Sequence, residues 1–154
     1  MRPSGRFTSA FPRTFRSSCS KRTMIEFLMV SGAPKPVAPY SHATAADGWV
    51  FVTGQIPTDP DDDNAPLPEG IEAQTHRVMK NLERVLSGIA SGLDRVACAR
   101  VYLTHFDRDY AAMNAVYQSY FASGRLPART CIGVTAIARG ALVEIDLLAR
   151  KTPA

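Results

Sequence analysis

The chain has 154 residues, of which 45% are hydrophobic and 21% charged, and its formal net charge is +4. This size and composition are typical of one globular domain that buries its own core without disulfides or a structural metal. No apolar run approaches the roughly 18 residues of a membrane span, so we expect a soluble protein with no membrane partner.

The positive charge is concentrated at the N-terminus. Six of the 18 basic residues and none of the 14 acidic ones lie in residues 1–25, which leaves 12 basic against 14 acidic residues, a net charge of −2, in the rest. An acidic body makes a nucleic-acid partner unlikely. The Arg- and Ser-rich segment resembles a mitochondrial or plastid transit peptide, and it equally fits a disordered leader or a mis-called start before Met24 or Met29. We therefore assign residues 1–30 to a basic leader and residues 31–154 to a single domain.

The cysteines indicate free thiols and no metal site. Cys19 lies in the leader, and Cys98 and Cys131 are not spaced as C-x-x-C. The three histidines are scattered and have no ligand-like offset to a cysteine. We expect a reducing, cytoplasmic compartment, or a mitochondrion or plastid if the leader is a genuine transit peptide.

The first part of the domain predicts an extended segment, a hairpin and a loop. Residues 31–43 are rich in proline, which favours an extended backbone. The Asp47-Gly48 pair predicts the turn of a β-hairpin over residues 42–53. Residues 57–70 contain four prolines and a run of acids, so we expect a solvated loop there.

Two helices and a strand follow. Apolar residues recur three and four apart from Ile71 to Ile89, which predicts an amphipathic helix that Gly92 ends. Val96–Leu103 is rich in β-branched residues and predicts a strand. A second helix is expected over Tyr110–Phe121, with Gly124 after its end.

Two strands close the domain, Thr130–Ile137 and Leu142–Ala149, with a turn at Arg139-Gly140. The order β-β-α-β-α-β-β predicts an α+β fold with both helices on one face of the sheet. Because the last strands are apolar on both sides, we expect the uncovered face to pack against another copy of the chain. Clefts between such copies are natural ligand sites.

An arginine and a thiol lie at the start of the first of these two strands. Arg129 and Cys131 are two residues apart, and strand side chains alternate with period two. A guanidinium suits a carboxylate or a phosphate, although it also forms surface ion pairs. Cys131 could be a nucleophile, but no histidine is adjacent in sequence, and a buried cysteine usually behaves as a small apolar residue.

The second strand carries a carboxylate among apolar residues. In "ALVEIDLLA" the face with Val143 and Ile145 is apolar, and Glu144 and Asp146 lie on the other face. A buried carboxylate is costly unless it is paired or hydrogen-bonded. Glu144 is therefore a candidate acid or base, an ion-pair partner of an arginine, or a residue of an exposed face.

Five segments together resemble one protein family. They are "APYSHA", "FVTGQIPTDP", "MNAVYQSYF", "LPARTC" and "ALVEID". Their order and spacing over about residues 33–150 are similar to those of the RidA (YjgF/YER057c) family of enamine and imine deaminases.

The resemblance implies a chorismate-mutase-like fold, a homotrimer with sites between subunits, and no cofactor. It implies hydrolysis of 2-imino acids, such as 2-iminobutanoate and 2-iminopropanoate, to 2-keto acids and ammonia. Arg129 would bind the substrate carboxylate, Glu144 would position or activate water, and the backbone of Cys131 would bind the substrate. The remaining pocket positions implied by the family are Tyr40, Thr53 and Asn114. Many members of the family have a serine at the position of Thr53.

Other functions fit the same residues. A catabolic deaminase acting on an enamine acid such as 2-aminomuconate needs the same arginine and glutamate. A protein that only binds keto acids needs Arg129 but not Glu144. Members of the family are also described as translation inhibitors and as chaperone-like proteins, and the net charge of −2 argues against the first of these roles.

Overall fold

The protein is built around one mixed β-sheet, described for residues 24–153 in a computed structural model. Its eight main elements are β1 (Glu26–Leu28), β2 (Ala43–Ala46), β3 (Trp49–Gln55), α1 (Gly70–Gly88), β4 (Val96–Leu103), α2 (Phe106–Ser119), β5 (Ala128–Gly133) and β6 (Val143–Arg150). Two single-turn 3-10 helices lie at Leu93–Arg95 and Ala138–Gly140. The predicted leader falls outside the described residues up to position 23, as does Cys19.

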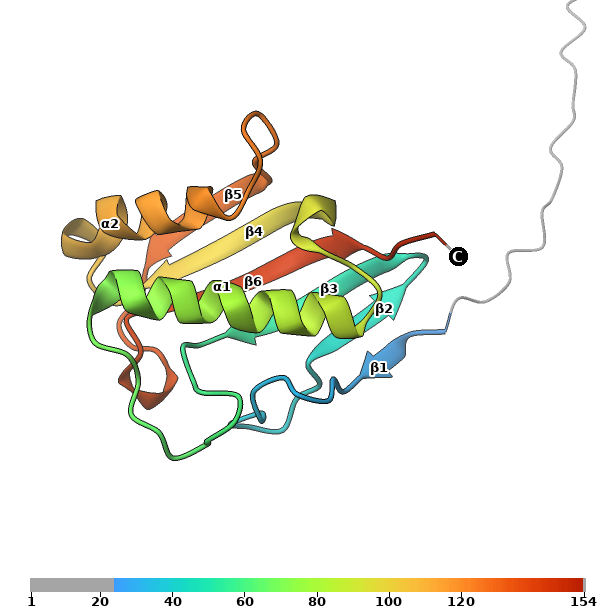
Figure 1. The fold of residues 1–154 in the computed structure, drawn as a ribbon, viewed down its shortest axis with the longest axis horizontal. Coiled ribbons are helices and arrows are strands. Elements are labelled where there is room, and N and C mark those ends of the chain that lie inside the picture. The colour runs from blue at the N-terminus through green and yellow to red at the C-terminus, as the bar shows by residue number, and fades with distance from the viewer. Residues whose placement is uncertain (1–23, 154) are drawn as a thin grey trace, which may run out of the picture.

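The sheet has the strand order β1-β2-β3-β6-β4-β5, so the last strand of the chain lies near its centre. All neighbouring strands are antiparallel except β4 and β5, which run parallel. Both helices lie on one side of the sheet, with α2 over the β5 edge (Figure 1). The predicted α+β class and the single helix-covered face are therefore confirmed. No helix within residues 24–153 is long and apolar enough to cross a membrane.

The core lies between this sheet face and α1. On β6, Val143, Ile145, Leu147 and Ala149 are at most 2% exposed. They meet the fully buried α1 side chains Val78, Met79, Leu82, Val85 and Leu86. The alternation in β6 thus places Glu144 and Asp146 on the opposite face from Val143 and Ile145, as the sequence predicts, and the structure shows that this face is the open one.

The hairpin between β2 and β3 also follows the prediction. Asp47 and Gly48 both have positive φ, 51° and 74°, as a two-residue hairpin turn requires. The proline-rich segment after β1 is held to this hairpin by His42, which is 3% exposed. Its Nδ1 accepts a hydrogen bond from the Val30 amide at 2.8 Å, and its Nε2 lies 2.8 Å from the Pro34 carbonyl oxygen.

Three boundaries differ from the predictions. Residues 26–28, assigned to the leader, form β1 by pairing with β2, and Glu26 forms an ion pair with Lys151 at 2.7 Å. Helix α2 begins at Phe106 rather than Tyr110, because acidic residues in its first turn are favourable near the helix N-terminus. Strand β5 ends at Gly133 rather than Ile137, because the chain leaves the sheet and Ile137 packs with Ile56 and Ala141.

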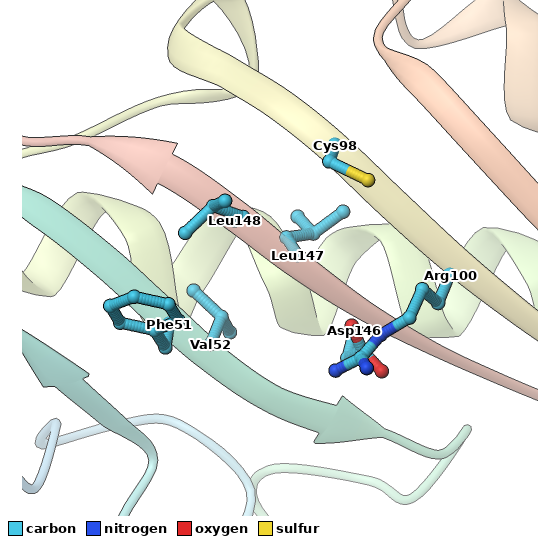
Figure 2. A pocket seen from close by; sticks show the side chains of 7 residues that line it. All are labelled: Phe51, Val52, Cys98, Arg100, Asp146, Leu147 and Leu148. Atoms are coloured by element: carbon cyan, nitrogen blue, oxygen red, sulfur yellow. Dashed lines mark hydrogen bonds and ion pairs between the residues drawn. The ribbon is translucent and has the colours of Figure 1, made fainter.

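The open face carries exposed apolar side chains. One cross-strand row runs through Phe27, Thr44, Phe51, Leu148 and Cys98, and the two phenylalanines are 73% and 52% exposed. Figure 2 shows the middle of this face, where a hollow of about 290 Å³ is bordered by Phe51, Cys98 and Leu148 and, at one end, by Arg100 and Asp146. Such an apolar surface is more typical of an interface than of a solvated sheet.

Candidate active site

Arg129 and Cys131 share the helix-covered face of the sheet. In the β4–β5 register, Arg129 is opposite Ala99 and Cys131 is opposite Val101. Both β4 residues are fully buried under the helices. The two β5 side chains therefore point to the same side, as predicted, and that side is the one covered by α2.

The Arg129 guanidinium lies over an aromatic ring rather than beside an acid. Its Cζ is 4.9 Å from the centroid of the Tyr117 ring on α2. Among residues 24–153, no acidic side chain forms an ion pair with Arg129, so the surface ion pair considered from sequence does not form. A groove of about 380 Å³ opens beside it, lined by Asn114, Tyr117, Gln118, Leu126, Pro127 and Arg129. A guanidinium without a counter-ion in a groove is suited to bind an anion.

Two residues of α2 that line this groove each carry a buried polar atom. The Asn114 Oδ1 and the Tyr117 hydroxyl are buried, and neither has a hydrogen-bond partner among the described residues. The two residues are three apart, so they lie on one face of the helix. Burial raises the pKa of Tyr117 to about 12 against the opposing effect of the Arg129 charge, so the phenol is neutral at physiological pH.

Tyr117 was not identified as a site residue from the sequence, because its position matches the apolar face of the second helix. The one signal in the sequence was its spacing of three residues from Asn114, which places both residues on one side of the helix. The tyrosine is indeed part of the core, at 3% exposed, so it combines a core position with contact to Arg129.

Cys131 lies between Arg129 and the core. Its side chain is half-buried and packs against the main hydrophobic cluster. Burial raises the pKa of the Cys131 thiol, opposed by the nearby Arg129 charge. Since the thiolate is the nucleophilic form, this environment is unfavourable for nucleophilic catalysis by Cys131.

Glu144 lies on the open face, opposite Tyr102 in the β4–β6 register. Burial raises the pKa of its carboxyl group, and the neighbouring Asp146 charge acts in the same direction. Asp146 is itself paired with Arg100, at 2.8 Å, and accepts a hydrogen bond from the Tyr102 hydroxyl at 3.1 Å. Among the described residues no cation forms an ion pair with Glu144, so no positive partner opposes this rise of its pKa.

A glycine makes room for the Glu144 carboxylate. The register between β3 and β6 shifts between Val52 and Gln55, and Gly54 lies in this bulge. A Cβ atom at Gly54 would overlap the Glu144 Oε1 atom. The absence of a side chain at Gly54 therefore sets the place of the carboxylate, a role that the sequence alone did not reveal.

Thr53 and Tyr40 lie next to this bulge. The Thr53 hydroxyl donates to the Ser41 carbonyl oxygen at 2.7 Å, and the Thr53 amide donates to the His42 carbonyl oxygen at 3.0 Å. These bonds hold the segment containing Tyr40 against β3. The Tyr40 hydroxyl accepts a hydrogen bond from the Val37 amide at 3.1 Å.

The six residues implied by the resemblance thus form two groups. The arginine group is Asn114, Arg129 and Cys131, and the glutamate group is Tyr40, Thr53 and Glu144. Arg129 projects from the helix-covered face of the sheet and Glu144 from the open face, so one chain does not bring them together. Within residues 24–153 no cluster of His, Cys, Asp and Glu side chains could hold a metal ion.

The six-stranded sheet with two helices on one face defines a protein of the α+β class. Comparison with known proteins identifies its family. Residues 30–151 match the family model described as Endoribonuclease L-PSP. A "RutC family protein" of Synechocystis is 37% identical over 81% of this chain and 95% of its own length. The "3-aminoacrylate deaminase RutC" of Acinetobacter baylyi is 36% identical over 80% of this chain and 96% of its own.

Solved structures agree with these sequence relatives. A protein of the Rid family from Yersinia pestis has a TM-score of 0.77 and 31% identity, covering 82% of this chain and 99% of that one. The chain belongs to the RidA (YjgF) family, as its five sequence segments predicted.

Proposed function

We propose that the protein hydrolyses small 2-imino acids, and their enamine forms, to 2-keto acids and ammonia. The observation that carries this proposal is an arginine without an acidic partner beside a groove, in a chain that also has a half-buried carboxyl group with a raised pKa. Arg129 supplies recognition of the acid, and Glu144 supplies proton transfer. A relative named as a 3-aminoacrylate deaminase supports a deaminase activity of this kind.

Arg129 binds the substrate carboxylate through two parallel hydrogen bonds. Its guanidinium has no acidic partner within the described chain, so the substrate does not have to displace one. The planar fork of an arginine matches the two carboxylate oxygens. The Asn114 side chain lines the same groove and can help to shape it around the substrate.

Glu144 exchanges the protons of the hydrolysis. As a carboxylate it removes a proton from water, whose oxygen forms a bond to the carbon of the protonated imine while the electron pair of the C=N π bond moves to nitrogen. The carboxylic acid so formed then protonates the nitrogen of this tetrahedral adduct. The carbon–nitrogen bond breaks while the hydroxyl group of the adduct gives its proton back to the Glu144 carboxylate, and ammonia and the keto acid leave. Glu144 then releases this proton to solvent. Its raised pKa makes the Glu144 carboxylate a stronger base than an ordinary glutamate, which favours removal of a proton from water.

A second copy of the chain completes the site. Arg129 and Glu144 project from opposite faces of one sheet, so Arg129 of one copy must meet Glu144 of another. The apolar row on the open face, with Phe27 and Phe51 exposed, favours such an assembly. We propose the homotrimer of the family, with one site in each of its clefts.

A second candidate substrate is an enamine acid such as 3-aminoacrylate, favoured by the deaminase relative. It carries one carboxylate and a nitrogen on a planar carbon, so Arg129 and Glu144 would act on it in the same way. An RNA substrate is disfavoured because the chain beyond residue 25 has 12 basic against 14 acidic residues.

A coupled assay tests the proposed function. Threonine dehydratase generates 2-iminobutanoate from threonine, and semicarbazide traps the imine that persists. Wild-type protein should lower the trapped amount, whereas Arg129→Ala should not. Arg125→Ala is the matched control, because Arg125 is an exposed arginine outside the groove. Equal trapping with and without folded wild-type protein would refute hydrolysis of this imine.

A binding measurement separates an enzyme from a protein that only senses keto acids. Glu144→Gln should abolish turnover and still bind 2-oxobutanoate through Arg129. Full deaminase activity in Glu144→Gln would show that another group activates the water.

A further inference from the structure

The contact between Arg129 and Tyr117 is fixed from the side of the tyrosine. Tyr117 is 3% exposed and belongs to the main core cluster. Its ring also packs against Phe121, with centroids 4.9 Å apart and planes tilted by 45°. The ring cannot move without disturbing the core, so the guanidinium above it rests on a rigid surface.

An aromatic surface orients a guanidinium without using its hydrogen-bond donors. A cation is attracted to the face of the ring, whereas the N–H groups of an arginine lie in the guanidinium plane. An acidic partner would instead occupy those donors and compete with a bound carboxylate. In this groove the arginine lies over a ring and not beside an acid. The Arg129 Cζ is 4.9 Å from the centroid of the Tyr117 ring, and Arg129 has no ion-pair partner within residues 24–153.

The phenol also remains neutral in this position. Burial keeps its proton bound, so no phenolate charge forms beneath the guanidinium. Its hydroxyl makes no hydrogen bond within the described chain. The attraction therefore comes from the ring itself, and a ring without the hydroxyl should serve equally well.

We propose that the Tyr117 ring is the positioning residue of Arg129, holding its guanidinium toward the groove with all donors free for a substrate carboxylate. This inference rests on the proposed function, since it takes Arg129 as the group that binds the acid. Tyr117 itself acts through Arg129 and has no direct role in the proton transfers.

The test is the dissociation constant for 2-oxobutanoate, measured by calorimetry on the full chain. Tyr117→Leu should weaken binding by about threefold to thirtyfold, the range expected for loss of a cation–π contact. Tyr117→Phe keeps the ring and should bind as the wild type does. In an Arg129→Ala background, Tyr117→Leu should cause no further loss, because no guanidinium remains to be positioned. A role in core packing alone would not show this dependence on Arg129.

Each contrary result has a separate meaning. Unchanged binding by folded Tyr117→Leu would overturn the inference, and so would equal losses in the Phe and Leu variants. A further loss in the Arg129→Ala background would overturn it as well. If Tyr117→Leu does not fold, Tyr117→Met, with a flexible side chain that fills irregular space, replaces it under the same criteria. Wild-type binding by Arg129→Ala would refute the carboxylate contact, and thereby the proposed function itself.

Discussion

Substitution of Gly54 tests whether the position of the Glu144 carboxylate controls the reaction. A Cβ atom at Gly54 would overlap Oε1 and lie 2.9 Å from Cδ and 3.1 Å from Cγ of Glu144. Carbon atoms in favourable contact are about 3.5–4.0 Å apart. In Gly54→Ala the carboxyl carbon must therefore retreat by about 0.5–1 Å, and Oε1 by more, or the group must rotate away.

A displacement of this size should lower the reaction rate strongly and change the stability of the fold little. Misplacement by about 1 Å can lower a rate about 100-fold, so we expect a loss of that order in imine hydrolysis. Gly54 does not have a positive φ, so alanine is compatible with its backbone and the stability should change little.

The coupled imine assay measures this loss, and the dissociation constant for 2-oxobutanoate provides the control. Binding should persist in Gly54→Ala, because Arg129 is not displaced. The double variant with Glu144→Gln should be no less active than Glu144→Gln alone. Wild-type turnover in Gly54→Ala would refute the idea that Gly54 sets the position of the catalytic carboxylate.

Three further predictions concern stability, each measured by urea unfolding at fixed protein concentration. Because burial raises the pKa of Glu144 above its ordinary value of 4.5, ionisation weakens the folded state as the pH rises from about that value. Glu144→Gln should thus be more stable than wild type at pH 7 and no more stable at pH 4; equal stability at both would contradict this. His42→Leu should lower the free energy of unfolding by about 2–4 kcal/mol, since the buried Val30 amide and Pro34 carbonyl lose their hydrogen-bond partners. A decrease below about 0.5 kcal/mol would contradict this. Gly88→Ala should be destabilising, because a Cβ there would collide with the Val30 side chain; unchanged stability would show that the segment after β1 adapts freely.

Local sequence patterns predicted the faces of the elements well. The alternation around Val143 and Ile145 placed Glu144 on the face opposite these two residues, and the spacing of Arg129 and Cys131 placed both on one side. These predictions succeeded because side-chain direction in a strand depends only on position along it. The Asp47-Gly48 turn succeeded for a similar reason, since its backbone conformation is encoded by two adjacent residues.

Local sequence patterns do not determine which strands pair in the sheet. The position of β6 between β3 and β4 depends on contacts between distant segments, and the three residues of β1 are too few to show a period. The role of Gly54 depends on β6 lying beside the bulge in β3, and the role of Tyr117 depends on α2 lying over β5. Site residues that act by making space or by supporting another side chain were therefore missed.

The most direct test of the central claim is complementation between two inactive variants. Arg129→Ala and Glu144→Gln subunits are co-expressed with different tags, mixed oligomers are isolated, and imine hydrolysis is measured. If Arg129 and Glu144 act from different copies, each mixed trimer regains both groups at one of its three sites, and activity returns to about one third of wild type. Mixed oligomers no more active than the separate variants would contradict a site shared between copies.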